Sequence, residues 1–143
     1  MSAFPNRILM LSVLTLFASH ARGQSLLYFQ SEHGAYIGGG QTFVVDESDG
    51  TFSARREFGG VTIHFEENDG FPWWDTTFTA PGGVTLTEGV YEDAIRYPFQ
   101  GPTLPGLDVS GGGTGCNQLT GRFVILEVSY FPNGEVDRFA ADF

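Results

Sequence analysis

Turn signals that contain glycine divide this chain into short segments rich in β-branched and aromatic residues. Three of them are the clearest: Ser48-Asp49-Gly50, Asn68-Asp69-Gly70 and Pro132-Asn133-Gly134. Asp-Gly and Asn-Gly pairs accept the positive φ angles that tight hairpin turns need, so the sequence predicts three β-hairpins. The predicted strands are residues 25–30, 41–47, 50–58, 61–67, 73–80, 90–97, 107–111, 121–130 and 135–143.

No segment beyond residue 23 sustains the spacing of apolar residues that an amphipathic helix shows. We therefore predict an all-β fold, an antiparallel β-sandwich of roughly eight or nine short strands with few or no helices. The final hairpin has apolar residues on both arms, but strict alternation fails at Val128, which predicts a β-bulge there. No linker, repeat or low-complexity tract interrupts residues 24–143, so we expect a single domain.

Residues 1–23 have the pattern of a secretory signal peptide. Arg7 precedes an apolar run from Ile8 to Ala18, and small residues at Ala21 and Gly23 mark a cleavage site. That run is much shorter than the ~20 residues that a membrane-spanning helix needs. We expect cleavage after Gly23, a secreted or periplasmic location and no transmembrane anchor.

The charge balance of the chain disfavours some partners. The whole sequence has 17 acidic residues against 7 basic ones, for a net charge of -10. All the basic residues are arginines, and two of them, Arg7 and Arg22, belong to the predicted signal peptide. Nucleic acid and anionic membrane surfaces are therefore poor partners, and an acidic surface suits a protein that must stay in solution outside the cell.

Two acidic turns could present oxygen atoms to a hard cation. Asp46 and Asp49 lie in one turn, and Glu67 and Asp69 lie in the other. Carboxylate oxygens are the ligands that Ca²⁺ prefers, although neither turn has the spacing of an EF-hand. Polar turn residues that face water explain the same pattern without an ion. Ca²⁺ is the one cofactor that these turns suggest, and the sequence indicates no other.

Trp73 and Trp74 are adjacent within a predicted strand, so their side chains must point to opposite faces of the sheet. Only one indole can enter the core. The other either lies under the Pro-rich segment 96–107 or is exposed, where it could stack on a sugar ring. A carbohydrate-binding module that uses Trp73 or Trp74 is therefore an alternative to a less specific binding or structural role.

The glycine-rich segment 108–115 superficially resembles the glycine-flanked serine of trypsin-like proteases. The residues before Ser110 are not Gly-Asp, and His64 alternates with apolar residues in a strand, a setting that is not typical of a general base. The same glycines follow no βα unit that would make them a phosphate loop, so a flexible turn explains them better. We predict no catalytic residues, and a hydrolase with a pair of carboxylates is the weaker alternative.

Several stretches of the chain resemble a family of exported bacterial domains to which no activity is assigned. They are YIGGGQT (36–42), DGTF (49–52), WW (73–74), APGGVTLTEGVYEDAIRYPFQ (80–100), PGLDVSGGGTGCNQLTGRFVILEV (105–128) and RFAADF (138–143). The motif G-x-G-x-G-C-N-x-L-T-G-x-F and the terminal R-F-A-A-D-F strand are the most specific of these. The family often has arginine where this chain has Thr114. The resemblance implies a β-rich fold and no particular chemistry.

Cys116 is the only cysteine of the chain. In an oxidising compartment a single cysteine indicates a missing partner, a bridge to another molecule or a free thiol. The family's last strand usually continues to a second cysteine, so the resemblance implies a disulfide between Cys116 and a residue beyond Phe143. Such a staple requires Gly121 and Phe143 to lie at the same end of the final hairpin.

Taken together, the sequence predicts an exported, non-catalytic β-sandwich domain. Its role is binding or structural and lies outside the bacterial cytoplasm. The expected partner is a carbohydrate or another extracellular protein.

Overall fold

The computed structural model describes residues 23–143, so the predicted signal peptide lies outside the described residues except for Gly23. The all-β prediction is confirmed, because this part consists of strands, loops and two single 3₁₀ turns. None of its helical turns is long and apolar enough to cross a membrane. The strands are β1 (Leu26–Gln30), β2 (Thr42–Asp46), β3 (Gly50–Glu57), β4 (Gly60–Glu67), β5 (Trp73–Thr79), β6 (Gly89–Arg96), β7 (Gly106–Gly111), β8 (Thr114–Gly115), β9 (Thr120–Tyr130) and β10 (Val136–Asp142).

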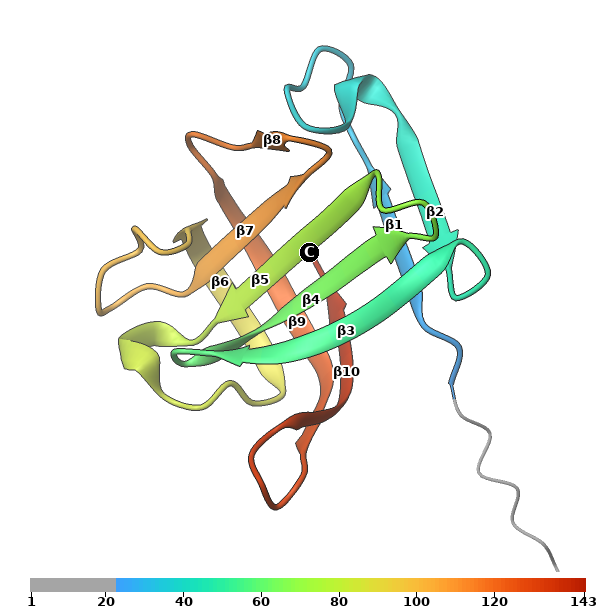
Figure 1. Cartoon of the computed structure of the whole chain (residues 1–143). Coiled ribbons are helices and arrows are strands. Elements are labelled where there is room, and N and C mark those ends of the chain that lie inside the picture. The colour runs from blue at the N-terminus through green and yellow to red at the C-terminus, as the bar shows by residue number, and fades with distance from the viewer. Residues whose placement is uncertain (1–22) are drawn as a thin grey trace, which may run out of the picture.

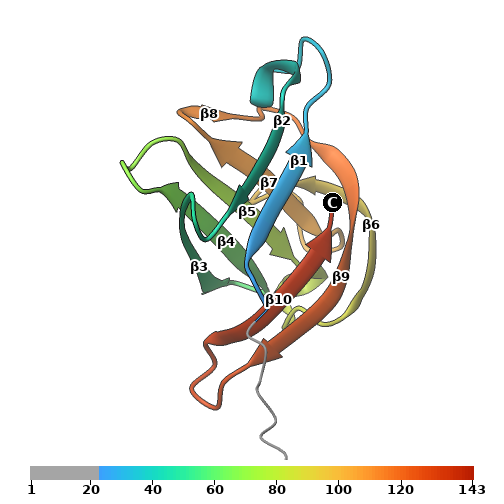
Figure 2. The ribbon, with the colours of Figure 1, turned by 90° about the vertical axis from the view of Figure 1, so that its right-hand side faces the viewer.

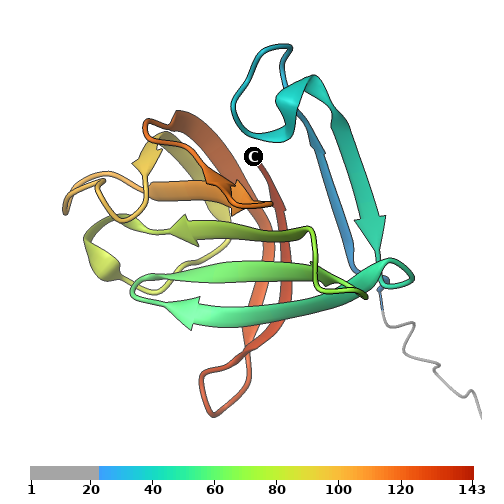
Figure 3. The same ribbon diagram turned by 45° about the horizontal axis from the view of Figure 1, so that its top comes forward.

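Eight strands form one strongly curved sheet. Their order is β10-β9-β6-β7-β5-β4-β3, and the short β8 pairs with β7. All neighbours are antiparallel except β6 and β7, which run parallel. The sheet curls into a nearly closed barrel in which β3 comes near β10 (Figures 1 and 3). At one end the Arg56 guanidinium of β3 spans this gap, 4.8 Å from the Tyr130 ring centre and 3.4 Å from the Gly134 carbonyl oxygen.

β1 and β2 form a separate antiparallel hairpin that lies beside the open side of the barrel (Figure 2). On its inner face, the rings of Phe29 and Phe43 pack edge-on against Trp74, at centroid distances of 4.6 and 5.0 Å. On its outer face, Tyr28 and Val44 stay exposed. The hairpin is therefore attached to the sheet by apolar packing and not by a shared hydrogen-bond ladder.

Two of the three predicted hairpins are confirmed, and one is wrong. Asn68-Asp69-Gly70 joins β4 to β5, and Pro132-Asn133-Gly134 joins β9 to β10; in both cases the joined strands pair. Ser48-Asp49-Gly50 instead joins β2 to β3, which belong to different sheets. Gly50 packs so tightly on the Glu66 carbonyl that a Cβ would not fit, and β3 takes β4 as its partner from its first residue.

The bulge predicted near Val128 is confirmed. The register between β9 and β10 shifts on both sides of this residue, once between Val136 and Arg138 and once between Ala140 and Ala141. An extra residue in one strand re-aims the side chains that follow it. These shifts allow the curved hairpin to keep its apolar side chains on the inner face.

The core consists of two apolar clusters on the inner face of the curved sheet. The larger one lies between β4-β5-β7 and β6-β9-β10, and its fully buried side chains include Phe78 and Phe123. The smaller one lies under the β1–β2 hairpin and is built on Leu27, Phe65 and Trp74. The outer face of β3, β4, β5 and β7 has no part in either cluster and is therefore left for polar side chains.

Candidate functional site

The outward face of the central strands carries a continuous array of polar side chains. Along β5, alternation sends Trp74, Thr76 and Phe78 inward and Trp73, Asp75 and Thr77 outward. The same alternation operates in β3, β4 and β7. We name the resulting array the outer polar face; its members are Ser53, Arg55, Glu57, Thr62, His64, Glu66, Trp73, Asp75, Thr77, Asp108 and Ser110.

Strand register arranges the outer polar face in rows that cross the sheet. One row runs from Ser53 through His64 and Asp75 to Ser110, and the next runs from Arg55 through Thr62 and Thr77 to Asp108. Directly opposed side chains on neighbouring strands have Cβ atoms about 5 Å apart. His64 and Asp75, in the middle of the first row, therefore have polar neighbours on both sides. Thr62 and Thr77 of the next row are buried and hydrogen-bonded to each other at 2.8 Å, so the first row is the one that a hydroxyl-rich ligand can reach.

Carboxylates hold the imidazole of His64 in place. Its Nδ1 lies 2.8 Å from Asp75 Oδ1, and its Nε2 lies 4.0 Å from Glu66 Oε2. The Arg55 guanidinium reaches the other oxygen of Asp75 at 3.6 Å. The Trp73 ring is stacked beside the imidazole, with centroids 6.4 Å apart and planes at 26°. Two aromatic rings are thus fixed next to one another on a sheet surface.

Asp108 and Arg96 lie at the other end of the outer polar face. The carboxylate oxygen Oδ1 is 3.7 Å from Arg96 Nε, and within residues 23–143 both atoms are buried without a hydrogen-bond partner. Burial raises the pKa of Asp108, and the neighbouring Ser110 and Arg96 offset this only in part. Arg96 Nε and Asp108 Oδ1 could each still form a hydrogen bond at this edge of the outer polar face.

The loop between β6 and β7 closes this same end. Gln100 Nε2 donates to Thr79 Oγ1 at 3.3 Å, and burial together with nearby Glu57 raises the pKa of Tyr97. Thr79 is the last of the seven residues of β5, about 20 Å from the first one, Trp73. Figure 1 likewise shows the loop at the far end of β5. The idea that segment 96–107 covers the outward tryptophan is therefore wrong.

The two tryptophans have different environments. Trp74 is only 4% exposed and lies among Phe29, Phe43 and Phe65, so its ring is not accessible to a ligand at the surface. Trp73 is half-buried on the outer polar face. Of the two residues considered for sugar stacking, only Trp73 lies where a ligand could reach it.

The two acidic turns contact each other through their backbones. Asn68 N donates to the Asp49 carbonyl oxygen at 3.1 Å, so the two turns touch. Asp46 Oδ1 accepts hydrogen bonds from the Ser48 amide and hydroxyl, which lower the pKa of Asp46, and Asp69 Oδ1 accepts one from the Phe71 amide.

Asp49 Oδ2 accepts a hydrogen bond from the Asp46 amide at 3.0 Å, and Glu67 ends β4 beside this turn pair. No three His, Cys, Asp or Glu side chains of the described chain converge as metal ligands would. The oxygens of Asp46 and Asp69 that the sequence offered to Ca²⁺ accept hydrogen bonds from the turns themselves.

The glycine-rich segment is only partly a turn. β7 continues to Gly111, so Ser110 lies within a strand of the outer polar face, and only Gly112 and Gly113 form the turn, at φ values of 56° and 80°. Cys116 follows β8 as a half-buried free thiol.

Gly121 and Phe143 lie at the same end of the final hairpin, as a disulfide between Cys116 and a residue beyond Phe143 requires. Asp142 pairs with Val124, which places Phe143 near Gly121 at one end of the β9–β10 pair. Cys116 lies five residues before Gly121, next to β8, which pairs with β7 and not with β10. A disulfide between Cys116 and a residue beyond Phe143 stays a prediction.

Sequence reasoning missed the pairing of His64 with Asp75, although a signal was present. The turn Asn68-Asp69-Gly70 was identified, and His64 and Asp75 are nearly equidistant from its centre. In a hairpin centred on that turn the two residues must face each other, as they do. Counting outward from the turn would have found the pair.

No family model, no curated protein and no solved structure matches this chain.

Proposed function

We propose that this chain is an exported, non-catalytic domain that binds carbohydrate on its outer polar face, with Trp73 as the stacking ring. The observation that carries the proposal is the placement of Trp73 beside His64 in an outward array of carboxylates and hydroxyls. An indole face offers an apolar surface to the C–H groups of a sugar ring. Carboxylate, imidazole and guanidinium groups around it exchange hydrogen bonds with sugar hydroxyls.

Charge on the outer polar face favours neutral sugars over acidic ones. Glu57 and Asp75 pair with the single arginine of the array, Arg55, and Glu66 adds a further negative charge beside His64. A uronate or sulfate group would meet like charges here, and like charges in proximity are unfavourable. We therefore assign the site to neutral oligosaccharides.

The surroundings of His64 support binding and not catalysis. Asp75 lies 2.8 Å from its Nδ1, whereas its Nε2 lies 4.0 Å from Glu66 Oε2, and no hydroxyl group of residues 23–143 is hydrogen-bonded to that nitrogen. Nucleophilic catalysis needs the base within hydrogen-bond reach of the nucleophile. The imidazole instead supplies a fixed flat surface and an oriented N–H group.

The proposed location outside the cytoplasm rests on the sequence alone. Residues 1–23 have the signal-peptide pattern, and the resembling family is exported. An acidic, lysine-free surface is compatible with a protein that meets its ligand outside the cell.

An array of neutral oligosaccharides tests the proposal. The wild-type protein is expected to bind a subset of the array, and Trp73→Ala is expected to bind the same glycans at least tenfold more weakly. Tyr36→Ala is the matched control, because Tyr36 is 76% exposed in the loop between β1 and β2, away from the outer polar face. Thermal melts of all three proteins establish that each is folded. The proposal fails if the wild type binds no glycan, or if Tyr36→Ala weakens binding as much as Trp73→Ala does.

A further inference from the structure

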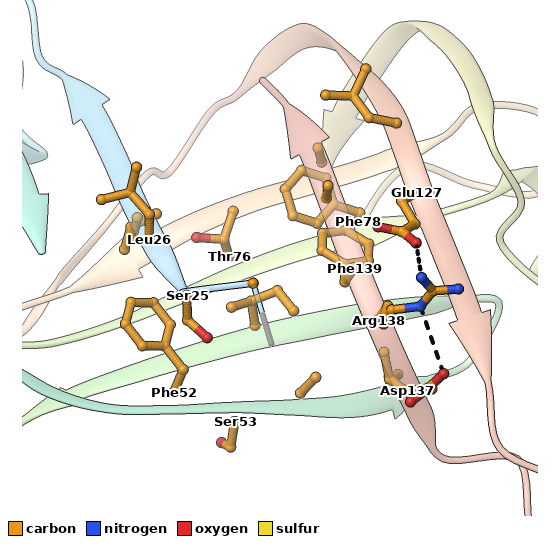
Figure 4. Close-up of a pocket in the computed structure, with 18 of the residues that line it drawn as sticks. Ser25, Leu26, Phe52, Ser53, Thr76, Phe78, Glu127, Asp137, Arg138 and Phe139 are labelled. Atoms are coloured by element: carbon orange, nitrogen blue, oxygen red, sulfur yellow. Dashed lines mark ion pairs between the residues drawn. The ribbon is translucent and has the colours of Figure 1, made fainter. Parts of the chain in front are cut away.

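A groove runs between β1 and β10, the facing edge strands of the two sheets. One part, of about 800 Å³, is lined by residues 23–27 and 136–141 (Figure 4). A second part, of about 480 Å³, is lined by residues 28–32 and continues the first along β1. Phe143 lines both parts, and Figure 2 shows β1 alongside β10. We name the whole feature the β1–β10 groove.

Edge strands form the walls of the β1–β10 groove: β1 and β10, with Phe52, Ser53 and Ala54 of β3 at one side. Within the described chain, β1 pairs with β2 alone and β10 with β9 alone, so each has one edge without a ladder partner. Consecutive residues of a strand point to opposite faces, yet unbroken runs of residues from both strands line the groove. An unbroken run is what a strand edge gives when it forms the wall of a groove.

The floor of the β1–β10 groove is largely apolar, and its mouth is charged. Phe78 of β5 and Phe139 of β10 are at the bottom, as Figure 4 shows. At the mouth Arg138 lies 2.9 Å from Glu127 and 3.8 Å from Asp137, which leaves a net charge of about -1 by simple count. The site therefore combines an apolar floor, two free strand edges and a weakly negative entrance.

We propose that the β1–β10 groove receives an extended segment of a partner protein as an added β-strand. Such a strand would take its hydrogen bonds from the free edges of β1 and β10 and would join the two sheets into one. β1 has five residues and β10 has seven, so a segment of about five to seven residues matches the walls.

A peptide fits this groove better than an amphiphilic small molecule does. A ligand without amide groups would cover the strand edges and leave their N–H and C=O groups without partners, at a cost of about 1–3 kcal/mol for each buried group. A peptide strand satisfies those groups as it covers them. Edge strands are also the usual place where one chain pairs with another.

The side chains around the groove define the chemistry of the segment. Alternate residues of an added strand would point to the floor, where Phe78 and Phe139 favour apolar side chains. The remaining residues would point outward, past Glu127 and Asp137 and into the field of an acidic protein. We therefore expect an alternation of apolar residues with neutral or basic ones, and no acidic residues.

Fluorescence anisotropy with a panel of labelled octapeptides tests the proposal. Valine, isoleucine or phenylalanine alternates with threonine and lysine in these probes. At least one probe is expected to bind saturably. Methylation of every second amide nitrogen in that probe is expected to weaken binding at least tenfold, because it removes the ladder donors, and exchange of its lysines for glutamates is expected to weaken binding as well.

Protein variants locate the binding. Leu26 and Leu126 line the groove and are 64% and 55% exposed, so Leu26→Asp and Leu126→Asp should fold normally and bind the probe at least tenfold more weakly. Val84→Asp is the matched control, because Val84 is 62% exposed and lines neither part of the groove. Glycan binding on the outer polar face is expected to be the same in all three variants, which separates this proposal from the previous one.

Four results would overturn the proposal. One is the absence of saturable binding across the panel, and another is equal binding of the N-methylated probe. Complete displacement of the probe by submicellar octyl glucoside would reassign the groove to an amphiphile. A concentration-dependent dimer that Leu26→Asp abolishes would reassign it to a second copy of this chain.

Discussion

Trp73 and Trp74 follow one another in the chain, yet their side chains have different roles. Trp74 fills the smaller core cluster, so Trp74→Ala is expected to lower the unfolding free energy by about 3–5 kcal/mol. Trp73 is only half-buried, and Trp73→Ala is expected to cost about 1 kcal/mol while it weakens glycan binding at least tenfold. Urea denaturation of both variants measures the difference. Equal losses of stability would contradict the assignment of one ring to the core and the other to a ligand.

Asp108 makes the free energy of unfolding depend on pH. Folding raises the pKa of Asp108, chiefly through burial. The ionised carboxylate is therefore less stable in the folded protein than in the unfolded chain. This group therefore lowers the unfolding free energy at neutral pH, and the effect disappears as the pH falls below the unfolded value of about 4.

Asp108→Asn is expected to remove this effect. The variant should be more stable than the wild type at pH 7 and should lose that advantage near pH 3. Urea denaturation across this range measures the difference between the two proteins. A variant that is less stable than wild type at pH 7 would mean that the ion pair with Arg96 outweighs the cost of burial.

At the scale of elements, Arg56 ties β3 to the turn between β9 and β10. Its guanidinium lies over Tyr130 and reaches the Gly134 carbonyl oxygen, both across the gap of the barrel. Arg56→Ala is expected to cost about 1 kcal/mol, because an exposed cation–π contact and two long hydrogen bonds, to the Gly134 carbonyl oxygen and to Thr85 Oγ1, are lost. Arg122→Ala, which breaks only an exposed pair with Glu92, is the control and should cost less than about 0.5 kcal/mol. Denaturation midpoints measure both, and equal losses would contradict a bridging role for Arg56.

The elements that local sequence predicts well are those whose partner is next along the chain. β4 with β5 and β9 with β10 are joined by Asn-Asp-Gly and Pro-Asn-Gly turns, and a turn of this kind specifies the pairing of its own two arms. β2 has the same kind of turn after it but pairs backward with β1, because Phe43 packs on Trp74. The parallel contact of β6 with β7 likewise depends on how the whole sheet curls, which no local signal encodes.

In the candidate site, too, the features set by neighbouring residues could be predicted, and those set by distant parts of the chain could not. Alternation alone predicted that Trp73 and Trp74 face opposite ways, but not which of them is buried, because that depends on where the β1–β2 hairpin packs. The position of the Asn68-Asp69-Gly70 turn is enough to predict that His64 faces Asp75. Its continuation to Ser110 required the pairing of β5 with β7, strands that are separated by the whole of β6 in the sequence.

At the scale of the whole molecule, the two proposed sites use opposite faces of the same strands. In β5, Thr76 and Phe78 line the β1–β10 groove, while Asp75 and Thr77 belong to the outer polar face. A ligand on one side of a stable sheet leaves the backbone of that sheet in place, so glycan affinity is expected to change less than twofold when the octapeptide is bound. Calorimetric titration of the glycan with and without saturating peptide measures this. A larger change would show that the sites are coupled.

The most direct test of carbohydrate binding on the outer polar face uses the two tryptophans of the chain as internal reporters. In a ¹⁵N–¹H spectrum each indole N–H gives its own signal, and Trp73→Phe assigns them. Titration with the strongest glycan from the array is expected to shift the Trp73 signal progressively and to leave that of buried Trp74 unchanged. A glycan that shifts only the Trp74 signal, or that binds without moving either one, would contradict the account.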